Sequence, residues 1–291
     1  MTCRLLALLA VLITFGGCTG PPAEPEPAAL RVMSFNVRLD VASDGADAWP
    51  HRRDAVARVI AGADLVGVQE ALPAMLADLD ARLPIYARLG TGRDADGGGE
   101  QSAILYRTDR LTLLDGGTFW LSATPDVPGS RGWDAALARI ATWGRFRDRR
   151  TGREIVHANT HFDHRGVAAR RESARLLATR LPTLANGAAL VLTGDLNATP
   201  EAEPIRLLAA AGLADARAAS AAPPTGPAGT WTDFGRVAPT DRIDYVFTAG
   251  PVRVRRFRTL DGRIGSVMET DDMREVSDHY AVEATVELGT E

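Results

Sequence analysis

The sequence predicts an α+β sandwich built from mixed or antiparallel sheets. Short apolar segments of strand length recur along the chain, whereas amphipathic helical segments separate only some of them. Neither an internal repeat nor an interdomain linker divides the 291 residues. With 45% hydrophobic and 24% charged side chains, the chain is expected to bury one large core. A regular alternation of strand and helix, which would indicate a parallel βαβ fold, is not seen.

The first half of the domain is predicted to contain two helices among its strands. Residues 50–61 place Ala55, Val56, Val59 and Ile60 on one helical face, which indicates an amphipathic helix. The other elements expected here are a helix at residues 73–82 and strands at residues 31–37, 65–68, 103–107, 140–147 and 154–161. Strands outnumber helices, as the predicted class requires.

The second half is predicted to add a long helix and further strands. Residues 167–181 carry the apolar stripe Val167, Ala174, Leu177 and Leu181. Strands are expected at residues 189–192, 243–247, 252–257 and 280–288, a helix start at residues 199–200, and a surface loop at residues 216–228. Residues 189–192 are continuously apolar, which is typical of a strand buried on both faces.

The residue composition excludes several kinds of chemistry. All 33 basic residues are arginine, so the chain cannot form a lysine Schiff base or a GK[ST] phosphate loop. Its two cysteines, Cys3 and Cys18, precede the domain, which therefore has no disulfide framework, thiolate zinc site or cysteine nucleophile. Any catalysis must use carboxylates, histidines, amides, hydroxyl groups or arginines.

The N-terminus has the features of an export signal at residues 1–17. Arg4 precedes an apolar run at residues 5–15, whose length is secretory rather than transmembrane. Two glycines then precede Cys18, an arrangement that resembles the lipobox of bacterial lipoproteins, so we expect lipidation at Cys18. Ordinary secretion and an uncleaved anchor are the alternatives.

A tether is expected between this signal and the folded domain. Residues 18–29 contain four prolines and two glutamates and cannot pack a core. We expect the domain to span residues 30–291 and to be a monomer. It would be exported, would face the periplasm or the cell exterior, and would contact the membrane only through the lipid at Cys18.

The overall charge gives no general attraction to polyanions. The formal net charge is -4, which does not favour binding to nucleic acid or acidic lipid. Local arginine clusters could override this, but apolar and basic residues alternate in them as on half-buried strands with solvated faces. The clusters are Arg145, Arg147, Arg149, Arg150 and Arg153, and Arg253, Arg255, Arg256 and Arg258.

Polar residues recur at the ends of the predicted strands. They are Asn36, Glu70, His161, Asp195, Asn197, Asp244, Asp278 and His279. Taken singly, each fits an ordinary turn or rim residue. Together they would gather carboxylates, amides and imidazoles at one rim, which is what a Mg²⁺ or Mn²⁺ site acting on a phosphate ester requires.

Six short motifs contain these residues. They are Ser34-Phe35-Asn36-Val37, Val68-Gln69-Glu70, Asn159-Thr160-His161, Gly194-Asp195-Leu196-Asn197, Asp244-Tyr245-Val246 and Ser277-Asp278-His279. In this order they resemble the motifs of the endonuclease/exonuclease/phosphatase superfamily, whose fold is that of DNase I. The resemblance covers residues 31–288 and implies a four-layer α/β/β/α sandwich of two mixed sheets, with the active site at one edge.

Two further stretches refine this resemblance. Residues 132–136 and 139–143 are similar to exported bacterial members, and the Asn-Thr-His segment is similar to the deadenylase-like branch. The abasic-site repair branch has a tyrosine where His161 stands, which disfavours a repair function.

The resemblance implies which residues bind the metal and which position the water that attacks the phosphate. Glu70 would be the main ligand of Mg²⁺ or Mn²⁺, with Asn36 and Asp278 completing or orienting the coordination sphere. Asp195 would align or deprotonate the attacking water, and Asn197 would hold that water or a phosphoryl oxygen.

The histidines are expected to bind the phosphate and stabilise its charge. His279 would contact it while Asp244 holds the imidazole, and His161 would stabilise charge from the other side. His164 and Arg165 would reach a second phosphate or a sugar, the alternative for His164 being that it fixes its loop. The implied mechanism is an in-line displacement by water.

The sequence thus predicts an exported, metal-dependent phosphoesterase. Its substrate could be a nucleotide, a nucleic acid, a sugar phosphate or a lipid head group, and the sequence does not choose between a diester and a monoester. The alternative function is a non-catalytic surface lipoprotein that uses the fold as a binding module.

Overall fold

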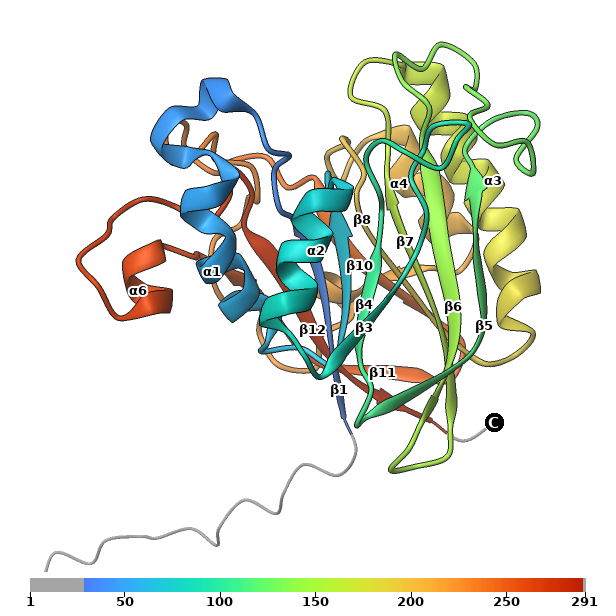
Figure 1. Cartoon of the computed structure of the whole chain (residues 1–291). Coiled ribbons are helices and arrows are strands. Elements are labelled where there is room, and N and C mark those ends of the chain that lie inside the picture. The colour runs from blue at the N-terminus through green and yellow to red at the C-terminus, as the bar shows by residue number, and fades with distance from the viewer. Residues whose placement is uncertain (1–28, 290–291) are drawn as a thin grey trace, which may run out of the picture.

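The computed structural model describes residues 29–289 and folds them into two stacked β-sheets (Figure 1). The predicted export signal, Cys18 and most of the tether lie outside the described residues. The first sheet contains β1 (Leu30–Asn36), β2 (Leu65–Gln69), β3 (Tyr86–Leu89), β4 (Ile104–Arg107), β11 (Val252–Leu260) and β12 (Ala281–Leu288). These strands lie in the order β11-β12-β1-β2-β4-β3.

The second sheet has the same number of strands within residues 29–289. They are β5 (Leu111–Trp120), β6 (Ile140–Asp148), β7 (Glu154–His161), β8 (Ala189–Asp195), β9 (Ala214–Asp215) and β10 (Asp244–Ala249), in the order β5-β6-β7-β8-β10-β9. Strands β1 and β2 are parallel, as are β7 and β8, and the other paired strands are antiparallel. Both sheets are therefore mixed.

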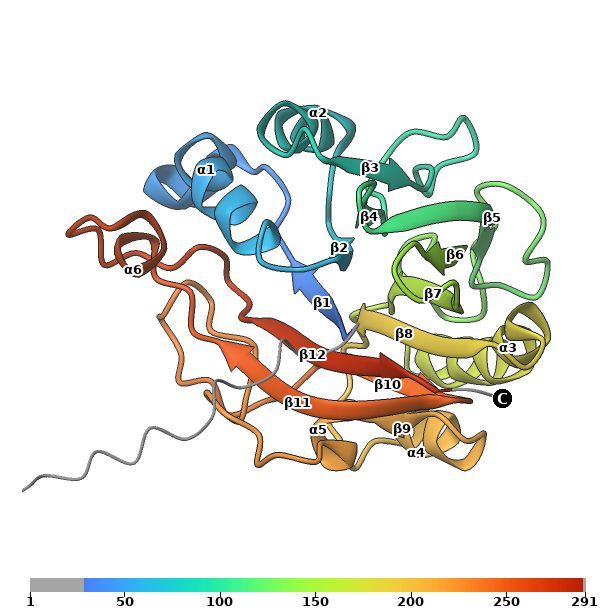
Figure 2. The same cartoon turned by 90° about the horizontal axis from the view of Figure 1, so that it is seen from below.

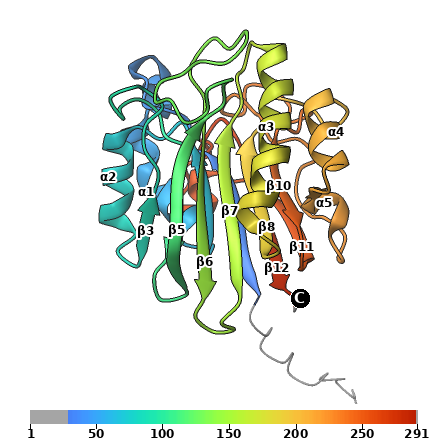
Figure 3. The ribbon, with the colours of Figure 1, turned by 90° about the vertical axis from the view of Figure 1, so that its right-hand side faces the viewer.

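Helices cover the outer face of each sheet (Figure 2). The helices are α1 (Trp49–Ile60), α2 (Pro73–Arg82), α3 (Val167–Ala185), α4 (Glu203–Ala210), α5 (Ala216–Ala219) and α6 (Ile264–Met268), with a 3-10 helix η1 at Ala42–Asp47. Core residues of α1, α2 and α6 cluster against the first sheet, and those of α3 and α4 against the second. Figure 3 shows α3 lying over the second sheet. The predicted four-layer α/β/β/α sandwich is confirmed.

Alternation along β1 shows how the sequence builds these layers. Leu30 and Val32 belong to the core between the two sheets, whereas Met33 and Phe35 pack into the core beneath α1 and α2. Successive side chains of a strand point to opposite faces, so one apolar strand contributes to both cores. Its continuous hydrophobicity follows from burial on both sides.

Some elements differ from the prediction. Strand β5 was not expected, because Asp115, Gly116 and Gly117 are poor strand formers and its pairing with β6 is irregular at that point. Strand β3 and helix α6 were also not expected. Helix α4 follows an N-cap at Ala202, because the segment after Thr199 forms a separate turn first. Helix α5 occupies the start of the predicted surface loop.

The predicted long helix runs further than its apolar stripe indicated. It continues through Pro182 to Ala185 and ends at Asn186, which adopts a left-handed conformation with φ of 46°. Within residues 29–289, no helix combines the length and apolar character needed to cross a bilayer.

Candidate active site

Strand direction brings the predicted site residues to one edge of the sandwich. The parallel pairs β1/β2 and β7/β8 end there with Asn36, Glu70, His161 and Asp195. Strand β10 is antiparallel to β8, and β12 is antiparallel to β1, so both begin at the same edge. Their starts add Asp244, Asp278 and His279.

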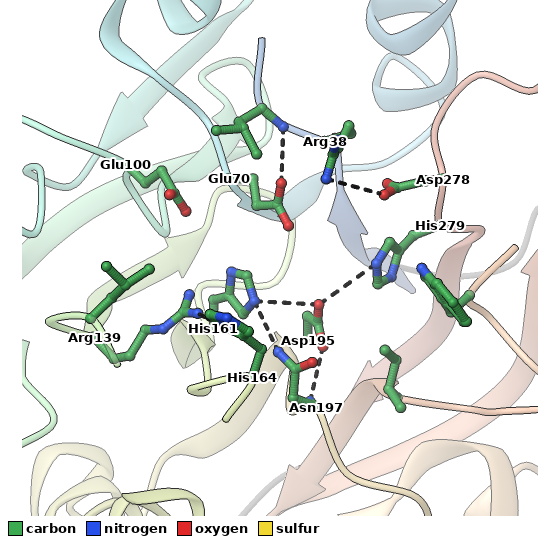
Figure 4. Close-up of a pocket in the computed structure, with 14 residues that line it drawn as sticks. Arg38, Glu70, Glu100, Arg139, His161, His164, Asp195, Asn197, Asp278 and His279 are labelled. Carbon is green, nitrogen blue, oxygen red and sulfur yellow. Dashed lines mark hydrogen bonds and ion pairs between the residues drawn. The ribbon is translucent and has the colours of Figure 1, made fainter. Parts of the chain in front are cut away.

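A cavity of about 490 Å³ opens at this edge (Figure 4). Its lining residues are Arg38, Leu39, Glu70, Glu100, Leu137, Arg139, His161, His164, Asp195, Asn197, Trp231, Ile243, Asp278 and His279. Asn36 and Asp244 are buried and contact the lining residues from behind. Arg165 is not among the lining residues, and its role in substrate binding remains a prediction.

Asn36 links the two principal carboxylates. Its Nδ2 donates to Glu70 Oε1 at 2.9 Å and to Asp195 Oδ2 at 3.0 Å. Its Oδ1 accepts a hydrogen bond from the backbone N–H of Arg38 at 3.0 Å. In this structure Asn36 therefore orients Glu70 and Asp195, and its direct ligation of a metal remains a prediction.

Backbone strain accompanies three of the lining residues. Arg38, Glu70 and Asn197 have φ angles of 54°, 62° and 46°, in the left-handed region. Such conformations cost roughly 1–3 kcal/mol each and persist only where the surrounding structure holds them. Glu70 follows β2 directly, and the backbone N–H of Leu39 donates to its Oε2 at 3.0 Å. Glu70 is thus held by donors on both carboxylate oxygens.

One flank of the cavity centres on His279. Its Nδ1 lies 2.8 Å from Asp244 Oδ2, and its Nε2 lies 3.8 Å from Asp195 Oδ2. Burial alone would lower its pKa, but Asp244, Asp195 and Asp278 outweigh burial and raise the pKa well above the ordinary value. These carboxylates therefore favour the protonated form of His279.

Asp195 lies between the two site histidines. Burial and repulsion from Asp244 raise its pKa to about 7, although His279, the backbone N–H of Asn197 and the amide of Asn36 act in the opposite direction. The carboxylate is 2% exposed.

The other flank centres on His161. Asn197 Nδ2 donates to Phe162 O at 3.0 Å and lies 3.1 Å from His161 Nε2. Because that amide is a donor, Nε2 accepts and the proton lies on Nδ1. Burial, followed by Arg139 and His279, lowers the pKa of His161 well below the ordinary value, so the ring is neutral. Its buried Nδ1 has no hydrogen-bond partner within the described chain.

Two carboxylates facing the cavity could hold a divalent cation. Glu70 and Asp278 both line it, and each Glu70 oxygen has lone-pair capacity beyond its one protein hydrogen bond. Burial raises the pKa of Asp278, and repulsion from Glu70 adds to that rise. A cation between them would relieve this repulsion, and the hard oxygen donors fit Mg²⁺ or Mn²⁺.

A second group of ligand atoms is less suited to a metal. Atoms of Asp195, Asp244 and His279 lie within 4.8 Å of one another. However, the Nδ1 of His279 and Oδ2 of Asp244 already form a hydrogen bond with each other. That these three residues act on the attacking water and on the phosphate remains a prediction.

The Asn-Thr-His segment also joins the two sheets. Asn159 in β7 donates to the carbonyls of Val68 at 2.8 Å and Ala103 at 2.9 Å, and accepts from Gln69 at 2.6 Å. Its amide is fully buried beneath the cavity. The first residue of this motif thus fixes the distance between the sheets, while His161 reaches the cavity.

Arg139 is the main lining residue that the sequence reasoning missed. It is 5% exposed, and its Nη2 lies 3.1 Å from His164 Nδ1. A guanidinium only donates, so the proton of neutral His164 lies on Nε2. The Nε of Arg139 lies 3.4 Å from Asp163 Oδ2. The position of Arg139 at the start of residues 139–143, one of the matched stretches, was the available signal.

Three other lining residues had weaker signals. Arg38 follows Asn36 by two residues and its Nη1 lies 3.8 Å from Asp278 Oδ2. Glu100 follows a glycine run and its Oε1 lies 2.7 Å from Arg93 Nη2. For Trp231, the sequence alone does not distinguish packing in the core from lining a substrate groove.

This fold and this site define a known class of proteins. Residues 33–279 match the Endonuclease/Exonuclease/phosphatase family. The chain belongs to this family. No curated protein sequence matches it.

Solved structures show the same relationship. A mannosyl-6-phosphatase of Bacteroides thetaiotaomicron VPI-5482 is 36% identical, with a TM-score of 0.83 over 89% of this chain and 100% of that chain. An endonuclease/exonuclease/phosphatase from Bacteroides vulgatus is 35% identical, with a TM-score of 0.83 over 89% of this chain and 99% of that one. The human Nocturnin catalytic domain shares the fold. It is 20% identical, with a TM-score of 0.68 over 90% of this chain and 95% of that one.

Proposed function

We propose that the protein is an exported, divalent-metal-dependent phosphoesterase that hydrolyses a small phosphate ester by in-line attack of water. The main support is one arrangement: Asp195 lies between His161 and His279 at the edge of a single cavity, with its Oδ2 3.5 Å from His161 Nε2 and 3.8 Å from His279 Nε2. Family membership and similarity to a mannosyl-6-phosphatase also support a phosphoesterase.

Asp195 is positioned to act on the attacking water. Its Oδ1 accepts from the backbone N–H of Asn197 at 2.9 Å, and its Oδ2 accepts from Asn36. These bonds fix the carboxylate plane at the base of the cavity. Asp195 would align the water and accept its proton as the new bond to phosphorus forms.

Two histidines flank the place where the phosphoryl group would lie. His279 offers a cationic N–H, and Asp244 fixes its ring. His161 lies on the other side of Asp195, with its Nε2 3.5 Å from Asp195 Oδ2, and Asn197 orients that ring. Donors held in place before the reaction stabilise the charge that develops on phosphoryl oxygens.

Glu70 and Asp278 would hold the divalent cation, with Asn36 fixing the orientation of Glu70. When bound, the cation supplies positive charge that stabilises the phosphoryl oxygens and the leaving oxygen. Arg38 lies beside the same carboxylates and limits the repulsion between them.

The substrate we favour is a monoester of limited size. The cavity is of small-molecule dimensions, since ligand pockets of about 300–1,000 Å³ are typical. The similar mannosyl-6-phosphatase acts on a phosphate monoester by its name. We propose a monomeric enzyme whose partner is this phosphate ester, with no extended track for nucleic acid.

Export remains part of the proposal. The apolar run of residues 5–15 and the glycines before Cys18 support secretion with lipidation at Cys18, facing the periplasm or the cell exterior. Globomycin sensitivity of processing and metabolic labelling with a fatty acid, compared between the wild type and Cys18→Ser, would test it. Unlabelled wild-type protein would contradict the lipidation.

The decisive experiment is a substrate panel with Mg²⁺, Mn²⁺ or Ca²⁺. It compares a phosphate monoester, a generic diester, single-stranded nucleic acid and a phospholipid, with and without EDTA. Turnover should require Mg²⁺ or Mn²⁺ and be fastest on the monoester. Full activity in EDTA would refute metal dependence.

Glu70→Gln tests which carboxylate holds the cation. It should weaken Mg²⁺ binding, measured by calorimetry, and lower turnover at least about 100-fold while the melting temperature stays near that of the wild type. Glu100→Gln is the matched comparison, because this carboxylate also lines the cavity but is paired with Arg93. An equal loss of Mg²⁺ binding in both variants would contradict the assignment to Glu70.

Wild-type protein that binds phosphate esters without turnover under any metal would instead support the binding-module alternative.

A further inference from the structure

An exposed tryptophan stands on a fixed backbone at the wall of the cavity. Trp231 is 38% exposed, whereas its neighbours Thr230 and Thr232 are completely buried. The carbonyl of Thr230 accepts from the backbone N–H of Tyr280 at 2.7 Å, and the N–H of Thr232 donates to the carbonyl of Asp278 at 2.8 Å. The backbone is therefore held on both sides of the tryptophan.

This pairing places Trp231 directly opposite His279 in an antiparallel bridge. The hydrogen bonds flank the pair instead of joining it, which is the narrow type of pair with Cα atoms about 4.5 Å apart. Directly opposed residues of an antiparallel pair carry their side chains on the same face. The indole therefore lies beside the imidazole that would contact the phosphate, and it lines the same cavity.

The opposite wall carries hydrogen-bond donors. Arg139 and His164 line the cavity across from His279 (Figure 4). The proton of His164 lies on Nε2, because Arg139 donates to Nδ1. A ligand that leaves the phosphate site thus meets an apolar ring on one side and donors on the other.

This combination fits a sugar better than a nucleobase. Among the lining residues of the described chain, Trp231 is the single aromatic ring apart from histidines, and Asn197 is the single carboxamide. A nucleobase is usually held by stacking and by donors and acceptors that read its edge. Hydroxyl oxygens accept from arginine and histidine, while the C–H face of a sugar ring can pack on one aromatic face.

We propose that Trp231 is a specificity-determining residue that packs the sugar ring of a hexose phosphate monoester. This inference rests on the proposed function. Hydrolysis would form a bond between the water oxygen and phosphorus and break the bond between phosphorus and the sugar oxygen. One proton would pass to that sugar oxygen, so the products are the free sugar and inorganic phosphate.

The test compares two phosphate monoesters that differ in the leaving group. Phosphate release is measured with mannose 6-phosphate and with methyl phosphate, which has no ring to pack. Trp231→Ala should raise the KM for mannose 6-phosphate about tenfold, equivalent to about 1.4 kcal/mol, with kcat changed less than about threefold. The constants for methyl phosphate should not change. Trp231→Phe, which keeps an aromatic face, should give an intermediate KM.

Trp133→Ala is the matched control. Trp133 is 42% exposed and does not line the cavity, so its removal should leave both substrates unaffected. Equal losses on both substrates in Trp231→Ala and Trp231→Phe would assign a structural role to this residue and overturn the proposal. A wild type that prefers a 5′-nucleotide, with the Trp231→Ala effect confined to it, would also overturn the sugar assignment.

Failure of the proposed function can be told apart from failure of this inference. A wild type that hydrolyses no ester with any metal would refute the phosphoesterase. Calorimetric binding of mannose 6-phosphate to the wild type and to Trp231→Ala in Mg²⁺ would still test the sugar platform. Equal affinity of the two proteins would refute it.

Discussion

The two flanks of the cavity differ in charge although their histidines are equally buried. His161 and His279 are 7% and 6% exposed, and both approach Asp195 Oδ2. The pKa of His161 is lowered well below the ordinary value, because burial and the nearby Arg139 act together. The pKa of His279 is raised, because its carboxylate neighbours outweigh burial. The neighbour of a histidine therefore decides its charge.

A third histidine shows what burial does alone. His157 lies in β7 beneath the cavity, is fully buried, and its Nε2 lies 2.7 Å from Thr193 Oγ1. Burial is the cause of its pKa falling to about 3. Compared with His157, the His161 flank adds cations and the His279 flank adds carboxylates. The surroundings of the two histidines that flank Asp195 thus shift their pKa values in opposite directions.

The largest loss of activity is expected from substituting Asp195 or His279. Asp195→Asn and His279→Ala should each lower kcat roughly a thousandfold or more, because both act on one transition state. The double variant should lose little beyond the more damaging single change. Steady-state kinetics of the three variants check this. Independent multiplicative losses would show that the two residues do not share a site.

Smaller losses of activity are expected from substituting one buried aspartate on each flank of the cavity. Asp244→Asn removes the carboxylate that orients His279 and should lower kcat about 10- to 100-fold. Asp163→Asn is the counterpart on the other flank, where Asp163 contacts Arg139 and the backbone N–H groups of Arg165 and Gly166. It should affect KM more than kcat. Equal kcat losses from both variants would contradict the functional difference between the flanks.

The depressed pKa of His157 predicts that the folded protein loses stability at acidic pH. Its pKa is depressed in the folded protein, so below about pH 6.5 only the unfolded chain takes up the proton and folding loses stability. This one group should contribute about 1.4 kcal/mol of lost stability per pH unit between about pH 6 and pH 4. Urea unfolding of His157→Gln across this window should show a shallower decline than the wild type. His51→Gln, at an exposed position, should not change the slope.

The smallest effect concerns salt. Several arginines of the two clusters form ion pairs: Arg145 and Arg147 pair with Glu154, and Arg258 pairs with Glu283. We therefore expect binding to depend on one or two phosphates in the cavity. Affinity of Asp195→Asn for a sugar phosphate should change less than about tenfold between roughly 50 and 200 mM salt. A steep slope with a strong preference for an oligonucleotide would favour a nuclease.

Local patterns predicted the α+β sandwich and the polar residues at strand ends, and the resemblance of six short motifs to a known family implied the four layers and the site. Alternation along β1 and the helical stripe in α1 arise from neighbouring residues. Polar residues at strand ends come together wherever parallel strands finish at one edge. Glu70 and Asp195 could be chosen in this way, whereas β5, with its central glycines, depends on pairing with β6 and could not.

The tertiary structure decided the charge states, the tautomers and the walls of the cavity. Arg139 faces His164, and Trp231 faces His279, across long separations in the sequence. Asn36 donates to two carboxylates that reach it from different strands. A side chain's type is fixed by the sequence, but its pKa and its hydrogen-bonding role depend on which groups surround it after burial, and those groups come from distant segments of the chain.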